Sequence, residues 1–229
     1  MAATSKKPAN NPAAVNRVKV WDLPTRLFHW LLVALVAVSF TTVKIGGNAM
    51  LYHQFSGYII LALLLFRMAW GFFGSRSSRF VSFVCSPAAV LRYAAGLLKR
   101  GTPRYLGHNP LGAWSILAML LVLLIQSGTG LFANDDIFTE GPLANLVSKT
   151  TSDWLTRIHR LNSDVILILI VIHVMAVIFY LLVKRDNLIA PMVTGFKMWT
   201  GRADPTGGNS YIALGLALLS ALAVFLLVR

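Results

Sequence analysis

The residues of this chain whose types and spacing could do chemistry are its histidines. His159 and His173 share one long apolar segment and lie fourteen positions apart. At about 100° per residue, the second imidazole returns to nearly the same helix face, about 21 Å further along the axis. Two imidazoles on one helix stripe are what two stacked metal centres would require. His29 and His53 each lie near one end of a separate apolar segment.

The elements that must position these side chains are helices that can cross a membrane. The 229 residues are 56% hydrophobic and 13% charged, with a mean hydropathy of +0.67. A soluble bundle would need polar faces at helical period, which the apolar segments lack. The first segment has no small-residue cleavage site after it, so it is interpreted as a retained helix rather than a signal peptide. The sequence predicts an all-α integral membrane protein with five spans, at Leu27–Val43, Tyr52–Phe73, Leu111–Phe132, Ile158–Val183 and Tyr211–Val228.

The distribution of basic residues predicts the topology. The formal net charge of +13 could in principle indicate a nucleic-acid partner. If the helices alternate in direction, however, most Lys and Arg residues fall on one side, and the mildly acidic loop 133–157 falls on the other. This asymmetry predicts a multi-pass protein of the bacterial inner membrane with a cytoplasmic N-terminus. No nucleic-acid partner is expected.

The alternating topology sorts the four histidines into two pairs at matching depths. His29 and His173 fall near the cytoplasmic face, and His53 and His159 fall near the outer face. A pair of imidazoles facing each other across a bundle suits axial ligation of haem iron, whereas zinc needs three or four ligands. Covalent attachment of haem needs two cysteines, and Cys85 is the only one. We therefore expect two non-covalent b-type haems; the alternative is that each histidine is a satisfied polar residue.

Glycines and arginines near the histidines could complete such sites. Glycine would let a flat macrocycle approach a helix backbone, although ordinary close helix packing is an equal alternative. Arginine could bind haem propionates, and an arginine deep in a span needs such a partner. The candidate glycines are Gly57, Gly112, Gly128 and Gly130, and the candidate arginines are Arg26 and Arg67 for the inner haem and Arg157 and Arg160 for the outer one.

Two further polar residues have open roles. His108 precedes the third span and could bind a propionate, cap the helix, line a quinone site or simply be solvated. Asp164 is expected to be buried early in the fourth span. It could release protons during quinol oxidation or bond to a neighbouring helix.

Several motifs of the chain resemble the bacterial cytochrome b561 and nickel–iron hydrogenase b-type cytochrome superfamily. They are the run from Trp21 to Trp30 (WDLPTRLFHW), His53 with Gly57, the run from Phe66 to Phe72 (FRMAWGF), and the run from Gly107 to Gly112 (GHNPLG). The resemblance covers roughly Val18 to Arg185. It implies a four-helix core with two b haems, ligated here by His29, His53, His159 and His173. It also implies electron exchange between membrane quinone and a partner protein.

Parts of the chain depart from that four-helix pattern. We expect a disordered cytoplasmic tail over residues 1–17, a di-haem transmembrane domain over 18–200, and a linker with a fifth transmembrane helix over 201–229. An amphipathic helix over Pro87–Arg100, with Ser86 as N-cap and Gly101 as its stop, is expected in the cytoplasmic membrane interface, and a loop lid is the alternative. Ala213, Ala217 and Ala221 form a small-residue ridge on the fifth helix, through which the chain could oligomerise.

The sequence leaves three functions open. The first is a carrier that moves electrons between the quinone pool and a periplasmic protein such as a c-type cytochrome. The second is an enzyme, a superoxide:quinone oxidoreductase. Because superoxide is an anion, this enzyme would need a cluster of basic residues around the outer haem to attract it. Lys149, Arg157 and Arg160 could form this cationic funnel, although acidic residues on the same side weaken it. The third is a haem-bearing membrane anchor subunit of a larger oxidoreductase such as a hydrogenase.

Overall fold

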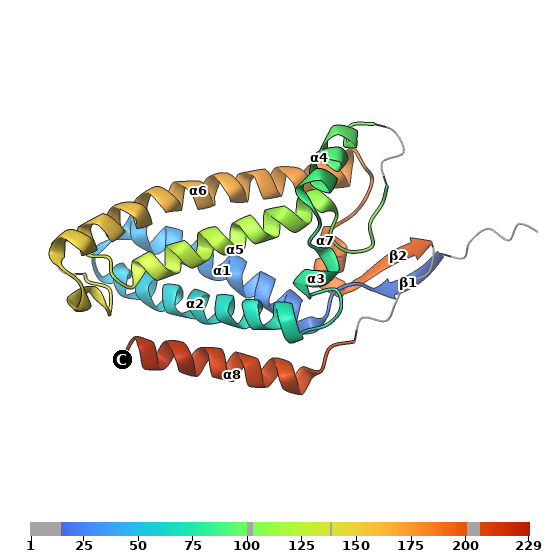
Figure 1. Cartoon of the computed structure of the whole chain (residues 1–229). Coiled ribbons are helices and arrows are strands. Elements are labelled where there is room, and N and C mark those ends of the chain that lie inside the picture. The colour runs from blue at the N-terminus through green and yellow to red at the C-terminus, as the bar shows by residue number, and fades with distance from the viewer. Residues whose placement is uncertain (1–14, 100–102, 138, 201–206) are drawn as a thin grey trace, which may run out of the picture.

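Five long helices run side by side in the computed structural model, which describes residues 15–99, 103–137, 139–200 and 207–229. Each is long and apolar enough to cross a membrane. Consecutive helices run in opposite directions (Figure 1). The expected all-α membrane class with five spans is therefore confirmed. The helices are α1 (Leu23–Ile45), α2 (Met50–Phe73), α5 (Pro110–Gly130), α6 (Lys149–Leu182) and α8 (Ser210–Leu227).

Polar side chains cap the start of four of these helices, and Asn209 is the residue that caps α8. The side chains of Asp22, Asn109 and Ser148 each accept a hydrogen bond from a backbone N–H in the first turn of α1, α5 and α6, respectively. Such caps satisfy donors that the first turn leaves without a helical partner. As a result α1 begins four residues before Leu27, and α6 begins nine residues before Ile158, where hydropathy alone placed their starts.

The helices pack in the order α1, α2, α5 and α6, and α8 lies against α2. Phe28, Leu64, Trp70, Leu120 and Ile166 form the core between them. The outer surface is apolar, and only 6% of the most apolar 18-residue stretch of α6 is buried inside the protein. This surface is what contact with lipid requires, and the protein is a multi-pass membrane protein.

Helix α8 contacts α2 mainly through residues outside the small-residue ridge. Ala213, Ser220 and Val224 are its buried residues, whereas Ala217 and Ala221 are exposed. The helix therefore turns only the first alanine of the small-residue ridge inward. Figure 1 shows α8 on the side of α2 away from α6.

The two ends of the bundle differ, and we name them for their contents. The sheet end carries α3 (Phe80–Phe83), α4 (Pro87–Gly96), α7 (Ile189–Thr194) and a two-stranded antiparallel sheet of β1 (Val15–Lys19) and β2 (Phe196–Thr200). The sheet pairs Val15 with Thr200 and Lys19 with Phe196. The far end carries the short 3-10 helices η1 (Gly47–Ala49) and η2 (Ala144–Leu146).

The sheet corrects the expected boundary of the disordered tail. Residues 15–17 were expected in the tail, but they form the start of β1 because β2 supplies hydrogen-bond partners for them. Residues 1–14 lie outside the described part of the chain, as do residues 201–206 of the expected linker.

Helix α4 is shorter than the expected Pro87–Arg100. Ser86 caps it as expected, since its hydroxyl accepts a hydrogen bond from the Ala89 N–H at 3.4 Å. The helix ends at Gly96, a residue that weakens helices because of its backbone freedom. The expected stop at Gly101 falls outside the described residues. Leu91 and Leu98 are exposed, as an interfacial position would require.

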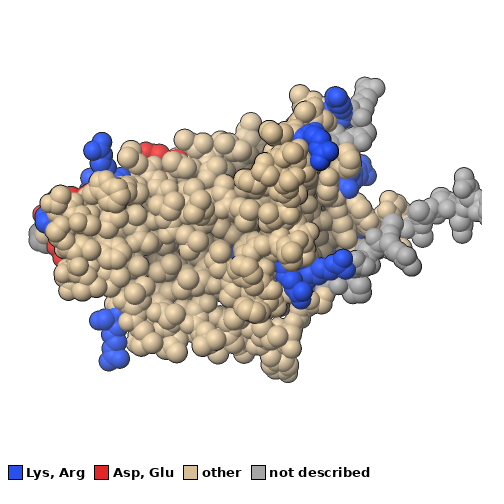
Figure 2. Space-filling model, viewed as in Figure 1, with Lys and Arg blue, Asp and Glu red and all other residues tan. Residues whose placement is uncertain are grey.

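Charge is distributed unequally between the ends. In Figure 2 the sheet end shows only basic side chains in view, whereas the far end shows both signs. At the far end Lys149 forms salt bridges with both Asp136 and Asp153. This pattern agrees with the expected positive-inside asymmetry. The orientation in the membrane stays a prediction.

Candidate functional site

The structure brings His53 and His159 together at the far end of the bundle. His53 lies in the first turn of α2, and His159 lies in α6. Their ring centroids are 6.2 Å apart, and the ring planes are nearly perpendicular at 85°. The pairing by depth that the sequence predicts is therefore present as a contact between two helices. We call these two residues the far pair.

Both rings of the far pair are held by backbone carbonyls. Nδ1 of His53 lies 3.0 Å from the carbonyl oxygen of Ser39, and Nδ1 of His159 lies 2.9 Å from that of Gln126. A carbonyl can only accept, so each Nδ1 carries the proton and donates it. Nδ1 of each ring is thereby used by the backbone, and Nε2 is the nitrogen left for a ligand. Histidines that bind metals are held in this way.

Gln126 also touches the free side of one ring. Its side-chain nitrogen lies 3.1 Å from Nε2 of His159, and the same side chain accepts a hydrogen bond of 2.7 Å from Asn162. A ligand at Nε2 would have to displace this amide. Neither Ser39 nor Gln126 was expected from the sequence. The only feature of the sequence that could have indicated them is that each is a polar residue within an apolar span next to the span that carries the histidine.

Three glycines border the far pair, in two different ways. A side chain on Gly130 would meet Cε1 of His159 at 2.9 Å, so this glycine gives the ring its space. A Cβ on Gly57 or Gly128 would meet nothing within 4 Å, so open space adjoins both. The open space suits a flat group beside the helix backbones. Gly112 is different, because its neighbour is the capping side chain of Asn109.

His29 and His173 approach each other nearer the sheet end. His29 lies in the second turn of α1, and His173 lies in the last third of α6. They are close enough to interact electrostatically, although α1 and α6 are not among the helix pairs that pack extensively. Nδ1 of His29 is buried and has no hydrogen-bond partner in the described part of the chain. We call these residues the near pair.

Two arginines beside the near pair carry buried nitrogens without partners among the described residues. Nη1 of Arg67 is one, and the whole residue is only 3% exposed. Its guanidinium lies 5.0 Å from the centre of the Phe80 ring. Nε of Arg26 is the other, while its Nη1 donates to the carbonyl of Val193. Buried cationic donors without partners require an acceptor, and the carboxylate of a haem propionate is a suitable one.

His108 lies next to this group of charges, between two aromatic rings. The centres of the Trp21 and Phe83 rings are each 4.5 Å from its own. Burial, with a smaller contribution from the positive charge of Arg67, lowers the pKa of His108 to about 3. The imidazole is therefore neutral at physiological pH. Its Nδ1 is buried and, within the described residues, has no partner, so a hydrogen bond to a bound group is open to it.

Asp22 organises the same end of the bundle, a role that was not expected from the sequence. Its carboxylate accepts hydrogen bonds from the Thr25 N–H at 2.7 Å, Ser78 Oγ at 2.8 Å and Trp70 Nε1 at 3.2 Å, and from Ser75 Oγ. Burial alone would raise the pKa of Asp22, but these bonds outweigh it and lower the pKa. Asp22 thus ties the start of α1 to the end of α2. Its place directly before the Leu-Pro-Thr start of a helix was a usable signal.

The remaining predicted residues lie on the outside of α6. Arg157 and Arg160 are exposed, and Arg160 is close enough to His159 to act on it electrostatically. Asp164 was expected to be buried, and this expectation is wrong: the residue is exposed. It lies five positions after His159, about 140° around the helix, and so points away from the histidine stripe.

The donor set fits haem better than a protein-ligated metal ion. Across the described residues no three His, Cys, Asp or Glu side chains gather into a possible metal site, so zinc would lack the ligands it needs. Two histidine pairs, open space at two glycines, and two buried arginine nitrogens without a hydrogen-bond partner in the described part of the chain instead suit two haems held by histidine.

Comparisons with known proteins agree with this geometry. A family model described as prokaryotic cytochrome b561 matches residues 20–195. A probable Ni/Fe-hydrogenase B-type cytochrome subunit of Rhizobium leguminosarum bv. viciae is 24% identical, over 86% of this chain and 96% of its own. The probable Ni/Fe-hydrogenase 1 B-type cytochrome subunit of Escherichia coli (strain K12) is 25% identical, over 78% of this chain and 89% of its own. No solved structure matches.

Proposed function

The chain belongs to the prokaryotic cytochrome b561 family, and we propose that it is a di-haem b-type membrane cytochrome that transfers electrons between membrane quinone and a redox partner. The observation that carries the proposal is the far pair. His53 and His159 face each other from two helices, and each uses Nδ1 on a backbone carbonyl. Nothing in ordinary helix packing requires two separate histidines to be held in this way.

The chain's own residues would hold the two haems at opposite ends of the bundle. The far pair and the near pair would each supply two imidazole nitrogens to a haem, and the two histidines on α6 are about 21 Å apart along the helix. Bound haem supplies reversible one-electron redox chemistry. Arg26 and Arg67 would neutralise propionates of the near haem. Arg157 and Arg160 are exposed and would interact more weakly with the far one.

Quinone would bind at the sheet end, close to Arg67 and His108. The neutral imidazole has a buried nitrogen available for a hydrogen bond to a quinone oxygen. The aromatic rings of Trp21 and Phe83 provide apolar walls on both sides of it. In the proposed inner-membrane orientation this end faces the cytoplasm. The far haem would then lie near the periplasmic face, where a partner such as a c-type cytochrome would meet it.

A second candidate function is that of a haem-bearing membrane subunit in a larger oxidoreductase. The names of the relatives from Rhizobium leguminosarum and Escherichia coli describe them as subunits of Ni/Fe-hydrogenases. This chain would then take electrons from a catalytic partner at the far end. The two candidates share the same haem sites and differ in the partner.

The third possibility, a superoxide:quinone oxidoreductase, receives less support. Its cationic funnel would need Lys149, but two carboxylates already pair with this lysine. Arg157 and Arg160 alone would have to attract the anion.

Stopped-flow mixing and mild purification test these functions. Reduced quinol should reduce the haems of the purified protein, and superoxide should not. Reduction by superoxide alone would overturn the quinone-coupled proposal in favour of the third possibility. Purification in mild detergent followed by mass spectrometry separates the first two: a catalytic subunit in fixed stoichiometry supports the subunit role, and an unaccompanied chain supports the free carrier.

A further inference from the structure

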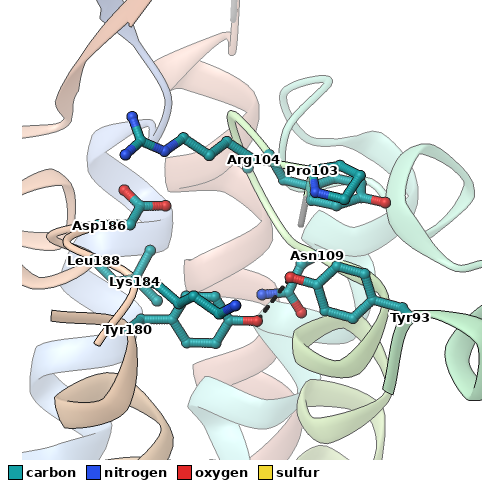
Figure 3. Close-up of a pocket in the computed structure, with 10 residues that line it drawn as sticks. Tyr93, Pro103, Arg104, Asn109, Tyr180, Lys184, Asp186 and Leu188 are labelled. Carbon is teal, nitrogen blue, oxygen red and sulfur yellow. Dashed lines mark hydrogen bonds between the residues drawn. The ribbon is translucent and has the colours of Figure 1, made fainter. Parts of the chain in front are cut away.

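A pocket at the sheet end lies outside the proposed haem and quinone sites. It lies between α4, the last turn of α6 and the segment before α5 (Figure 3). Tyr93 of α4 and Tyr180 of α6 line it from opposite sides, and their hydroxyls are 2.8 Å apart. Charged side chains complete the polar part of the lining, namely Arg104, Lys184 and Asp186.

The charges around the pocket favour an anion. Asp186 is paired with Lys197 at 2.8 Å, and both side chains are largely buried, so this carboxylate is already neutralised. Arg104 is exposed, and no carboxylate among the described residues pairs with it. Lys184 adds a second positive charge to the lining. Figure 3 shows the guanidinium of Arg104 extended along the side of the pocket where Asp186 lies.

The two tyrosines add a hydrogen-bond donor. Two hydroxyls carry two protons, and the bond between them uses one, so the other can be donated to a ligand oxygen. Burial raises the pKa of Tyr93, which keeps its hydroxyl protonated. The pocket therefore offers two cations and one neutral donor, a set that suits the oxygens of a phosphodiester.

The position of the pocket indicates that the phosphate belongs to a lipid. The long apolar run of α6 ends at Val183, and Lys184 and Asp186 follow it, so the pocket lies at headgroup depth. Leu182 and Val183 are exposed next to it, at 68% and 64%. Acyl chains along this face would cover both, whereas a soluble phosphate would leave them bare.

We propose that this pocket binds the headgroup of an anionic phospholipid, with Arg104 and Lys184 contacting the phosphate and the tyrosine pair donating a hydrogen bond to it. Basic pockets at helix ends recognise anionic lipids through the same chemistry. Such a lipid would also fix α4 against α6. The proposal depends only on the protein being in a membrane, so its test needs no redox measurement.

Native mass spectrometry of the delipidated, haem-loaded protein in detergent tests the proposal. Phosphatidylglycerol should bind more tightly than phosphatidylcholine, whose headgroup has no net charge. Arg104→Gln should weaken phosphatidylglycerol binding about fivefold, as expected for one basic residue near a lipid headgroup. The matched control is Arg92→Gln, which removes an exposed charge of α4 that does not line the pocket, and it should leave binding unchanged.

Four results would overturn the proposed lipid site. Equal binding of the two lipids, or equal losses in the two arginine variants, would overturn the proposal. Displacement of the lipid by millimolar inorganic phosphate would also overturn it, because the pocket would then be a site for soluble phosphate. If Arg104→Gln melts early without lipid, Lys184→Gln carries the test, because it removes the other proposed phosphate contact and should weaken phosphatidylglycerol binding by a similar factor. Unchanged binding in that variant would overturn the proposal.

Discussion

Each imidazole of the far pair donates from Nδ1 to a backbone carbonyl, and Nε2 is the nitrogen that a ligand would use. In His159 the side-chain amide of Gln126 lies 3.1 Å from that Nε2. The carbonyls of Ser39 and Gln126 take the Nδ1 protons, and they belong to α1 and α5, neither of which carries a far-pair histidine. The ring orientations are therefore fixed by helices outside the pair. The near pair differs, because Nδ1 of His29 has no partner in the described chain. This difference would make the far site the more rigid of the two.

Asp22 gives a prediction at the same scale. Asp22→Asn should lower the free energy of unfolding by roughly 2 kcal/mol, because a buried charged acceptor loses its charge while its donors remain. The pKa of Asp22 is lowered in the folded protein, so the carboxylate stabilises the fold fully above its unfolded pKa of about 3.9. That stability is lost as the pH falls through the lower folded pKa.

Melting temperatures between pH 3 and 7 check this prediction. The wild type and Asp22→Asn should differ most above about pH 4 and converge below it. Asp164→Asn is the matched control, since that carboxyl is exposed and should change little. A difference that stays constant down to pH 3 would contradict the account.

Residue spacing predicted part of the site and left part of it out. The pairing of His53 with His159 followed from alternating helices, because the position of a residue along a spanning helix gives its depth in the membrane. The Asp22 network did not follow, because Ser75 and Ser78 lie in an irregular turn whose path no periodicity describes. Asp164 was placed wrongly because polarity alone does not say which helix face a residue occupies.

Among the elements, α1 and α6 stand at the two ends of the packing order. Each of these helices packs mainly on one neighbour, α2 or α5. Their histidines nevertheless approach each other. The proposed near haem would lie between α1 and α6, which carry His29 and His173, and the proposed far haem would lie between α2 and α6. Sequence predicted the five helices, because apolar length is a strong local signal. It did not predict the sheet, since β1 and β2 are five residues each, contain no fully buried residue and lie far apart in the chain.

The packing of α8 against α2 predicts different effects for the same substitution on its two faces. Ala213→Leu should destabilise the protein by about 1–3 kcal/mol, because the added carbons would overfill the contact with α2. Ala217→Leu makes the same change on the exposed face of the same helix. It should alter stability by no more than about 0.5 kcal/mol. Thermal melting in detergent measures both, and equal effects of the two substitutions would show that α8 does not pack as described.

At the scale of the whole molecule, the two ends are chemically different. The sheet end gathers basic side chains, Arg26, Arg67 and His108, whereas the far end has mixed charge. Quinone chemistry at the sheet end and protein partners at the far end would follow from this polarity. Both assignments depend on how the molecule is oriented.

Cys85, the only cysteine, tests the orientation. It is free, half-buried and between α3 and α4 at the sheet end. A membrane-impermeant maleimide should label it in inside-out vesicles and in detergent, but not in intact spheroplasts. The double variant Cys85→Ser/Ile137→Cys moves the thiol to an exposed far-end position, 74% exposed, and should reverse the pattern. Labelling of Cys85 from outside would contradict the predicted cytoplasmic N-terminus.

The haem content of single-histidine variants tests whether each histidine pair holds one b haem. Pyridine haemochrome quantification should find two b haems per chain in the wild type. His53→Ala should lose the far haem and keep the near one, and His29→Ala should lose the near haem and keep the far one. The haem that remains shows that each variant still folds. A wild type without haem, one that holds zinc instead, or a His53→Ala variant that keeps both haems would contradict the account.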